Sequence, residues 1–111
     1  MFLHHSDEGY VLALPGIVRK TLAYGAKTLM VEFRLEKGAT LPRHSHPYEQ
    51  IGYLVSGRMV LTIDGEAREL APGDSWCIAE GVAHGAEVRE EAVAVEVFAP
   101  VRPDYLPDAA R

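Results

Sequence analysis

The sequence predicts an all-β sandwich or barrel. Turn signals recur roughly every ten residues, several segments between them alternate apolar and polar side chains, and no window shows sustained helical periodicity. The chain has 111 residues, the commonest size for a single domain. We therefore expect one domain over residues 1–111, with the barrel core at about residues 17–99 and a C-terminal arm at residues 100–111.

Two strands are expected in the first third of the chain. Residues 17–24 are predicted to form a strand that ends at Gly25. Residues 28–36 alternate cleanly, and four apolar side chains fall on one face: Leu29, Val31, Phe33 and Leu35. This alternation indicates a strand with one buried side.

The middle of the chain predicts two hairpins. Residues 49–63 contain two apolar runs on either side of a Ser-Gly pair, and we expect a hairpin there. The Asp-Gly pair at residues 64–65 is a strong two-residue hairpin signal. It leads into a strand at residues 66–70, and a Pro-Gly-Asp turn then leads into a strand at residues 75–79.

The last clear strand is expected at residues 92–98. One of its faces carries two small side chains and two large ones: Ala92, Ala94, Glu96 and Phe98. The acidic stretch before it, residues 87–91, is expected to be a solvated turn. Pro103 and Pro107 cannot donate ladder hydrogen bonds, so the C-terminal arm is expected to lie over the surface instead of forming a central strand.

The composition excludes several classes of protein. A formal net charge of −5 argues against nucleic acid as a partner, because phosphate binding needs clustered Lys and Arg. No apolar run approaches the ~18 residues of a membrane helix. Cys77 is the only cysteine, so no intrachain disulfide can form, and we expect a soluble cytoplasmic protein. Between Trp76 and Ile78, Cys77 is expected to be a small buried hydrophobe.

Three of the five histidines lie in two short segments and indicate a mononuclear metal site. Imidazole is the commonest metal ligand, and His44 and His46 would lie on one face of an extended strand, with His84 joining them from a distant segment. Gln50 keeps the parity of this face and Glu49 does not, although Pro47 interrupts regular geometry.

Residues 38–57 resemble the first motif of the cupin superfamily, with Gln50 where the family usually has a glutamate ligand. Residues 73–88 resemble the second motif, with Ala79 in place of the usual proline and Val88 in place of the usual asparagine. The resemblance implies a cupin-type double-stranded β-helix, a jelly-roll barrel. It also implies one divalent transition metal (Zn, Ni, Fe, Mn or Cu) with four protein ligands, His44, His46, Gln50 and His84.

Residues 44–53 and 95–106 are similar to the pectin-degradation cupins, which convert unsaturated monouronates to linear keto acids. The resemblance implies a pocket that combines the metal with Glu96, Phe98 and Arg102, where Glu96 replaces the usual aspartate. We expect Arg102 to orient a substrate carboxylate and Glu96 to transfer a proton. Tyr48 shares strand parity with the ligands and is expected to border the pocket.

The same residues also have purely structural interpretations. Glu96 could simply pair with Arg34 or Arg102, and Phe98 and Tyr53 lie in apolar strands where core packing is the commoner fate. Two other functions also fit the superfamily: a metal-dependent dioxygenase, and a non-catalytic module that binds a small anion or sugar.

The expected partners are a small anionic substrate and a second copy of the chain. Domains of this kind commonly dimerise through exposed strand faces, and Met30, Val60 or Trp76 could contribute. We therefore predict a homodimer. Size-exclusion chromatography with light scattering checks this prediction, and a pure monomer would contradict it.

Overall fold

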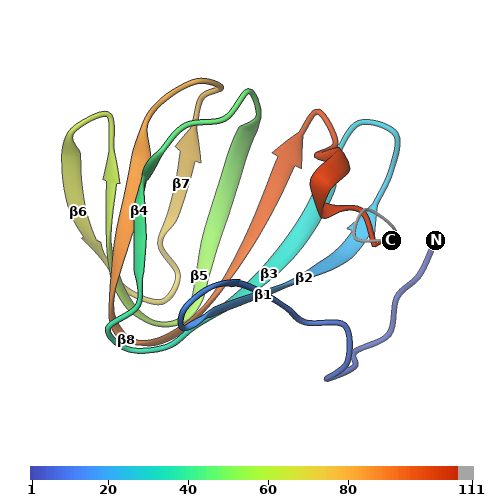
Figure 1. Ribbon diagram of the computed structural model, residues 1–111, viewed down its shortest axis with the longest axis horizontal. Coiled ribbons are helices and arrows are strands. Elements are labelled where there is room, and N and C mark those ends of the chain that lie inside the picture. Colours follow the sequence, from blue (N-terminus) through green and yellow to red (C-terminus); the bar gives the residue numbers. More distant parts are fainter. Residues whose placement is uncertain (108–111) are drawn as a thin grey trace.

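The computed structural model describes residues 1–107 and shows an all-β architecture (Figure 1). The strands are β1 (Val11–Leu14), β2 (Ile17–Tyr24), β3 (Leu29–Leu35), β4 (Thr40–His44), β5 (Glu49–Ile63), β6 (Glu66–Leu70), β7 (Ser75–Ile78) and β8 (His84–Ala99). A short 3-10 helix, η1 (Pro103–Tyr105), follows β8. The predicted fold class, an all-β jelly roll, is confirmed.

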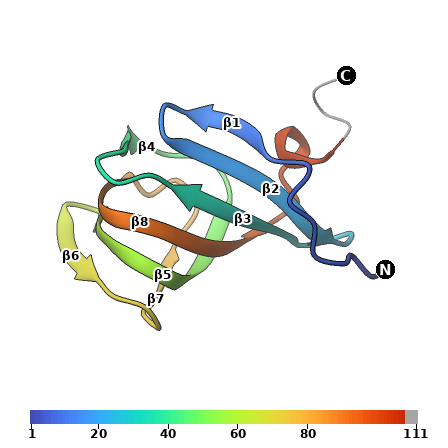
Figure 2. The same ribbon diagram turned by 90° about the horizontal axis from the view of Figure 1, so that it is seen from below.

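Two long strands, β5 and β8, hold the barrel together because each takes part in both halves. All pairs are antiparallel, and the main path runs β1-β2-β3-β8-β5-β6. The first part of β8 pairs with β4 and its last part with β3, whereas the first part of β5 pairs with β7 and its last part with β6. Figure 2 shows β2, β3, β8 and β5 side by side.

The predicted alternation decides which side chains face the interior. In β3, Leu29 and Val31 are fully buried, whereas Met30 between them is exposed. In β8, Ala94 and Phe98 are buried on the inner face, as expected for that strand. No helix in the described part of the chain is long and apolar enough to cross a membrane.

The hairpin predicted at residues 49–63 is wrong, because these residues form the single strand β5. The pairing of β5 with β8 shifts register three times between Leu54 and Met59, which marks a bulged stretch. Gly57 lies within it at a φ of +86°. Because bulges break the period-two alternation, one bent strand has the sequence pattern of two strands.

The turn predicted at residues 87–91 is also wrong, since these residues belong to β8. Glu87 and Glu90 pair with Val60 and Arg58 of β5. Their side chains are solvated, as the charge pattern indicated, but the backbone is extended. Charged side chains on the solvent-facing side of a strand can therefore give a sequence pattern that resembles that of a loop.

Gly57→Ala is expected to destabilise the fold by at least about 3 kcal/mol. An added Cβ would lie 2.2 Å from the carbonyl oxygen of Glu91 and 2.5 Å from the Cα of Ala92, so β5 and β8 would have to separate. Gly65→Ala is the matched control, because Gly65 has a similar φ of +81° and nothing within 4 Å of an added Cβ. Its expected cost is about 1 kcal/mol, from backbone strain alone. Urea unfolding measures both values, and equal losses would show that the close approach is unimportant.

Two side chains expected in the core lie outside it. Cys77 is exposed, because the alternation of β7 turns Trp76 and Ile78 inward and Cys77 outward. Tyr53 is likewise half exposed, on the outer side of β5. Trp76 is buried and is therefore not available to a dimer surface, whereas Met30 is exposed. The homodimer stays a prediction.

The C-terminal arm forms no strand within residues 100–107, and residues 108–111 of it lie outside the described part. The arm places Tyr105 against Phe33 and Phe98, with ring centroids 6.5 and 5.4 Å apart. The hydroxyl of Thr21 in β2 donates to the backbone oxygen of Tyr105 and ties the arm to the barrel. The arm thus closes one side of the interior.

Candidate metal centre

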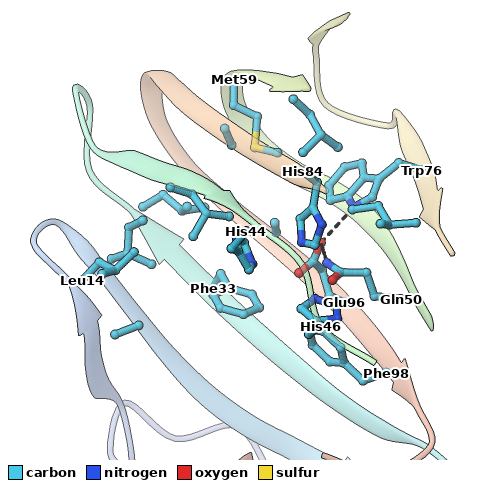
Figure 3. A pocket seen from close by; sticks show the side chains of 18 of the residues that line it. Leu14, Phe33, His44, His46, Gln50, Met59, Trp76, His84, Glu96 and Phe98 are labelled. Atoms are coloured by element: carbon cyan, nitrogen blue, oxygen red, sulfur yellow. Dashed lines mark hydrogen bonds between the residues drawn. The ribbon is translucent and has the colours of Figure 1, made fainter. Parts of the chain in front are cut away.

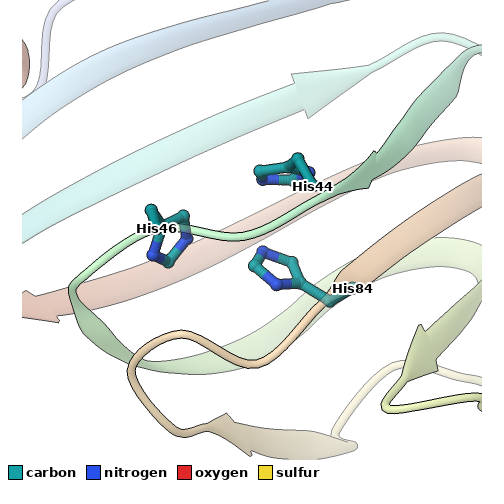
Figure 4. Close-up of side chains that lie close together, drawn as sticks. All are labelled: His44, His46 and His84. Carbon is teal, nitrogen blue, oxygen red and sulfur yellow. The ribbon is translucent and has the colours of Figure 1, made fainter.

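Three imidazole rings face one another in the barrel (Figure 4). His44 ends β4 and His84 begins β8, and the two residues are direct partners in the β4–β8 ladder. Their ring centroids are 4.3 Å apart, and that of His46 is 4.9 Å from His84. One nitrogen from each ring lies within 4.8 Å of the others, so the cluster can hold one metal ion.

The route by which His46 reaches this cluster differs from the prediction. The strand β4 ends at His44, and His46 lies in the connection to β5 instead of continuing the same strand. The parity argument for these two residues is therefore wrong, although both side chains reach the same place. The backbone N–H of Gly81 donates to the carbonyl oxygen of His46 at 2.8 Å and joins this connection to the loop before β8.

Backbone carbonyl groups set the orientation of two of the rings. Nδ1 of His44 donates to the carbonyl oxygen of Pro42, and Nδ1 of His84 donates to that of Val82, both at 2.9 Å. A carbonyl oxygen can only accept, so in the neutral ring the proton is on Nδ1 and Nε2 keeps its lone pair. Both rings thus have a free ligand atom.

The fourth predicted ligand, Gln50, lies on the inner face of β5 and is 4% exposed, while Glu49 beside it is exposed. Within residues 1–107, the buried side-chain atoms that have no hydrogen-bond partner are Oε1 of Gln50 and Nδ1 of His46. Buried polar atoms are normally paired, so these two atoms fit a site that is completed by a bound cation. The donor set of three imidazoles and one amide oxygen suits a divalent transition metal.

Electrostatics favour the metal-binding form of the rings. Burial is the main cause that lowers the pKa of His46 and of His84, and the nearby positive charge of Arg102 lowers both further. The side chain of Gln50 opposes the lowering of the His46 pKa, and the bond to the carbonyl oxygen of Val82 opposes that of the His84 pKa, but burial outweighs both. A lowered pKa keeps imidazole neutral, and neutral imidazole is the form that binds metal.

Glu96 projects from β8 toward Gln50 and Trp76 (Figure 3). Its Oε1 accepts hydrogen bonds from Nε1 of Trp76 at 2.8 Å and from Nε2 of Gln50 at 2.9 Å. Burial raises the pKa of Glu96, and these two hydrogen bonds and Arg102 oppose the rise. The simple ion pair with Arg34 or Arg102 is absent among the described residues, where Arg34 pairs with Glu32 and Arg102 with Asp104.

Arg102 is held by aromatic rings and by one carboxylate. Its guanidinium carbon lies 5.0 Å from the ring centroids of Tyr48 and Phe98 and 3.8 Å from that of Tyr105. Its Nη2 and Nε donate to Asp104 at 2.9 and 3.3 Å. Its Nη1 makes no hydrogen bond within residues 1–107, and guanidinium N–H groups of this kind are suited to a carboxylate.

These groups surround a cavity of about 210 Å³. Its polar lining consists of the three histidines with Gln50, Glu96 and Arg102. Its apolar lining includes Phe33, Leu61, Ile78, Ala94, Phe98 and Tyr105. Phe98 is therefore both a core residue and part of the cavity wall. Tyr48, which was expected to border the pocket, contacts Arg102 but is not among the described residues that line the cavity.

Three contributors to the site were missed at the level of sequence. Trp76 was expected to pack in the core or at a dimer surface, Asp104 received no role, and Tyr105 was part of the surface arm. From the alternation of β7, the sequence could have predicted that the indole of Trp76 faces the interior. The hydrogen bond from Trp76 to Glu96, however, joins residues 20 positions apart. Nothing local in the sequence signals such a contact.

Comparison with known proteins gives consistent matches. The Cupin domain family matches residues 31–99. The pectin degradation protein KdgF of Dickeya dadantii (strain 3937) is 34% identical over 93 residues, which cover 82% of this chain and 84% of that protein. The solved structure of KdgF from Halomonas sp. matches with a TM-score of 0.90 at 31% identity, over 96% of this chain and 98% of that one. An RmlC-like cupin from Shewanella frigidimarina matches with a TM-score of 0.89 at 27% identity, over 95% of both chains. On this evidence the chain belongs to the cupin family.

Proposed function

We propose that this protein is a metal-dependent enzyme that opens and ketonises a 4,5-unsaturated monouronate or a similar small sugar acid. The observation that carries the proposal is the convergence of three kinds of group on one cavity: the histidine cluster with Gln50, the carboxylate of Glu96, and the guanidinium of Arg102. The similarity to two KdgF proteins, one of them called a pectin degradation protein, supports the choice of substrate class.

The size of the cavity supports a single small molecule as the ligand. Pockets for drug-sized ligands usually enclose about 300–1,000 Å³. The cavity here encloses about 210 Å³, which suits one sugar ring better than an oligosaccharide. Its walls mix polar and apolar groups, which suits a small ring that carries a carboxylate and hydroxyl groups.

The reaction is an isomerisation that needs one proton to leave an oxygen and one to reach a carbon. The anomeric hydroxyl loses its proton, the bond between C1 and the ring oxygen breaks, and C4 gains a proton as C5 becomes a ketone. Glu96 would accept the first proton and deliver the second, while Arg102 would hold the substrate carboxylate. The raised pKa of Glu96 supports this role, because a carboxyl group exchanges protons best when its pKa lies near the working pH.

His44, His46, His84 and Gln50 would hold the ion. A bound divalent ion would supply Lewis acidity toward an oxygen of the substrate, and four neutral ligands would leave its charge uncompensated. The apolar side of the cavity would keep bulk water from the reacting carbons.

The test is to follow unsaturated galacturonate and guluronate by NMR under anaerobic conditions, after measuring the metal bound to the purified protein. Loss of the alkene signal faster than the uncatalysed rate is expected, with no oxygen required. Oxygen consumption with a flavonol, diketone or thiol substrate would instead identify a dioxygenase. Saturable binding with unchanged ligand would identify a binding module, and either result would overturn the proposal.

Arg102→Lys is expected to raise KM for the uronate about tenfold, since a lysine lacks the planar fork that pairs with a carboxylate. Arg19→Lys is the matched control. The guanidinium of Arg19 also stacks on Tyr105, at 4.1 Å from the ring centroid, but Arg19 is not among the described residues that line the cavity. Steady-state kinetics on both variants measures the difference. Equal KM values would show that Arg102 does not contact the substrate.

A further inference from the structure

We propose that Glu96, anchored by Trp76, is also a positioning residue that turns the amide of Gln50 so that its oxygen faces the three histidines. This inference rests on the metal-binding half of the proposed function and is independent of the reaction. It assigns Trp76 and Glu96 to the support of the metal site, and it explains why the fourth ligand position carries an amide.

The carboxylate of Glu96 determines which way round the side-chain amide of Gln50 lies. A glutamine side chain can lie either way round, because its oxygen and nitrogen ends have nearly the same shape. Here Nε2 of Gln50 donates to Oε1 of Glu96 at 2.9 Å. The reverse orientation would place two oxygen atoms in contact and lose the hydrogen bond. The carboxylate therefore selects the orientation in which Oε1 of Gln50 points away from Glu96.

In this orientation Oε1 of Gln50 is turned toward the cavity. Oε1 of Gln50 is buried and has no hydrogen-bond partner in residues 1–107. Leaving a buried acceptor unpaired costs about 1–3 kcal/mol, and a cation among the imidazoles would remove that cost. The histidine cluster and this oxygen line the same cavity. Orientation by Glu96 thus converts a neutral amide into a preorganised ligand.

Trp76 holds the carboxylate of Glu96 in place. Nε1 of Trp76 donates to the same Oε1 at 2.8 Å, so one carboxylate oxygen joins an indole on β7 to an amide on β5 (Figure 3). The indole lies flat against the backbone of Gly52, its ladder partner on β5, where an added Cβ would be 2.2 Å from Cε2 of the ring. Gly52 therefore allows the approach that places Nε1 against Glu96.

The arrangement also disfavours a second ionised carboxylate at position 50. A glutamate there would place a second carboxylate within hydrogen-bond distance of Glu96, and two negative charges so close repel each other. The amide avoids this repulsion and supplies the N–H that Glu96 accepts. Gln50 and Glu96 therefore act as a pair.

The experiment measures the affinity of the metal-free protein for Zn²⁺ by calorimetry, in the wild type and in two variants at one position. Glu96→Gln keeps an oxygen that accepts from both Trp76 and Gln50, so it is expected to bind Zn²⁺ about as tightly as the wild type. Glu96→Leu keeps the approximate volume and removes the acceptor, so its affinity is expected to fall about 10–100-fold. Wild-type affinity in Glu96→Leu would overturn the inference. An equal loss in both variants would also overturn it, because charge and not orientation would then be responsible.

A second measurement uses the wild-type protein alone, so it does not depend on whether a variant folds. In wild-type protein labelled with ¹³C and ¹⁵N, the Cδ resonance of Gln50 is expected to shift on addition of Zn²⁺, while the Nε2 proton that is donated to Glu96 stays bound and slow to exchange. An unmoved Cδ resonance would contradict the inference. A wild-type protein that binds no Zn²⁺ would overturn the metal site as well, whereas normal Zn²⁺ binding without ketonisation would contradict the proposed reaction alone.

Discussion

Glu96→Gln is expected to lower kcat for uronate ketonisation by about 10²–10⁴-fold. The substitution replaces a carboxyl group, which can exchange a proton, with an amide, which cannot. The amide still keeps an oxygen that accepts from Trp76 and Gln50. KM should change little, because Arg102 still holds the substrate carboxylate. The measurement is the rate of loss of the alkene NMR signal at saturating substrate, on protein loaded with the same metal as the wild type.

The control for this prediction is a second carboxylate that lies close to the cavity and outside the proton pathway. Asp104→Asn removes the charge opposite Arg102 but keeps an oxygen that can accept from it. We expect this variant to alter KM more than kcat, the reverse of Glu96→Gln. If Glu96→Gln retained the wild-type kcat, Glu96 would be a positioning residue alone and the proposed proton transfer would be wrong.

His84→Ala is expected to weaken Zn²⁺ binding by at least about a hundredfold and to abolish turnover. His84 is 3% exposed, and its ring centroid lies within 5 Å of those of both other rings, so the substitution removes one of the three imidazoles of the cluster. A ligand at 100 times its Kd stabilises a protein by about 2.7 kcal/mol. Zn²⁺ at 100 times the wild-type Kd should therefore raise the Tm of the wild type by about 10 °C and that of His84→Ala by no more than about 2 °C.

His5→Ala is the control, because His5 is an exposed histidine near the N-terminus and contacts only Asp7 among ionic partners in the described chain. Its Zn²⁺-dependent rise in Tm should equal that of the wild type. Thermal unfolding with and without Zn²⁺ measures all three proteins. A wild-type response in His84→Ala would mean that the histidine cluster is not the binding site.

The regular strands of the barrel follow from short-range patterns. Alternation over residues 28–36 and 92–98 identified β3, the end of β8 and their buried faces, because strand pleating turns successive side chains to opposite sides. The hairpin at residues 49–63 was wrong for the same physical reason, since bulges around Gly57 interrupt that period. Pattern reasoning succeeds where the strand is regular and fails where it bends.

By itself, the sequence determined the all-β class, and through its two cupin-like motifs the jelly roll, the cluster of His44, His46 and His84, and Gln50 as the inward side chain, because motif spacing is a local property of the chain. The tertiary structure alone decided that Trp76 and Gln50 share one oxygen of Glu96, and that the C-terminal arm brings Asp104 and Tyr105 to Arg102. Such contacts depend on how bulged strands register and close around an interior, and that geometry is set by packing across the whole barrel.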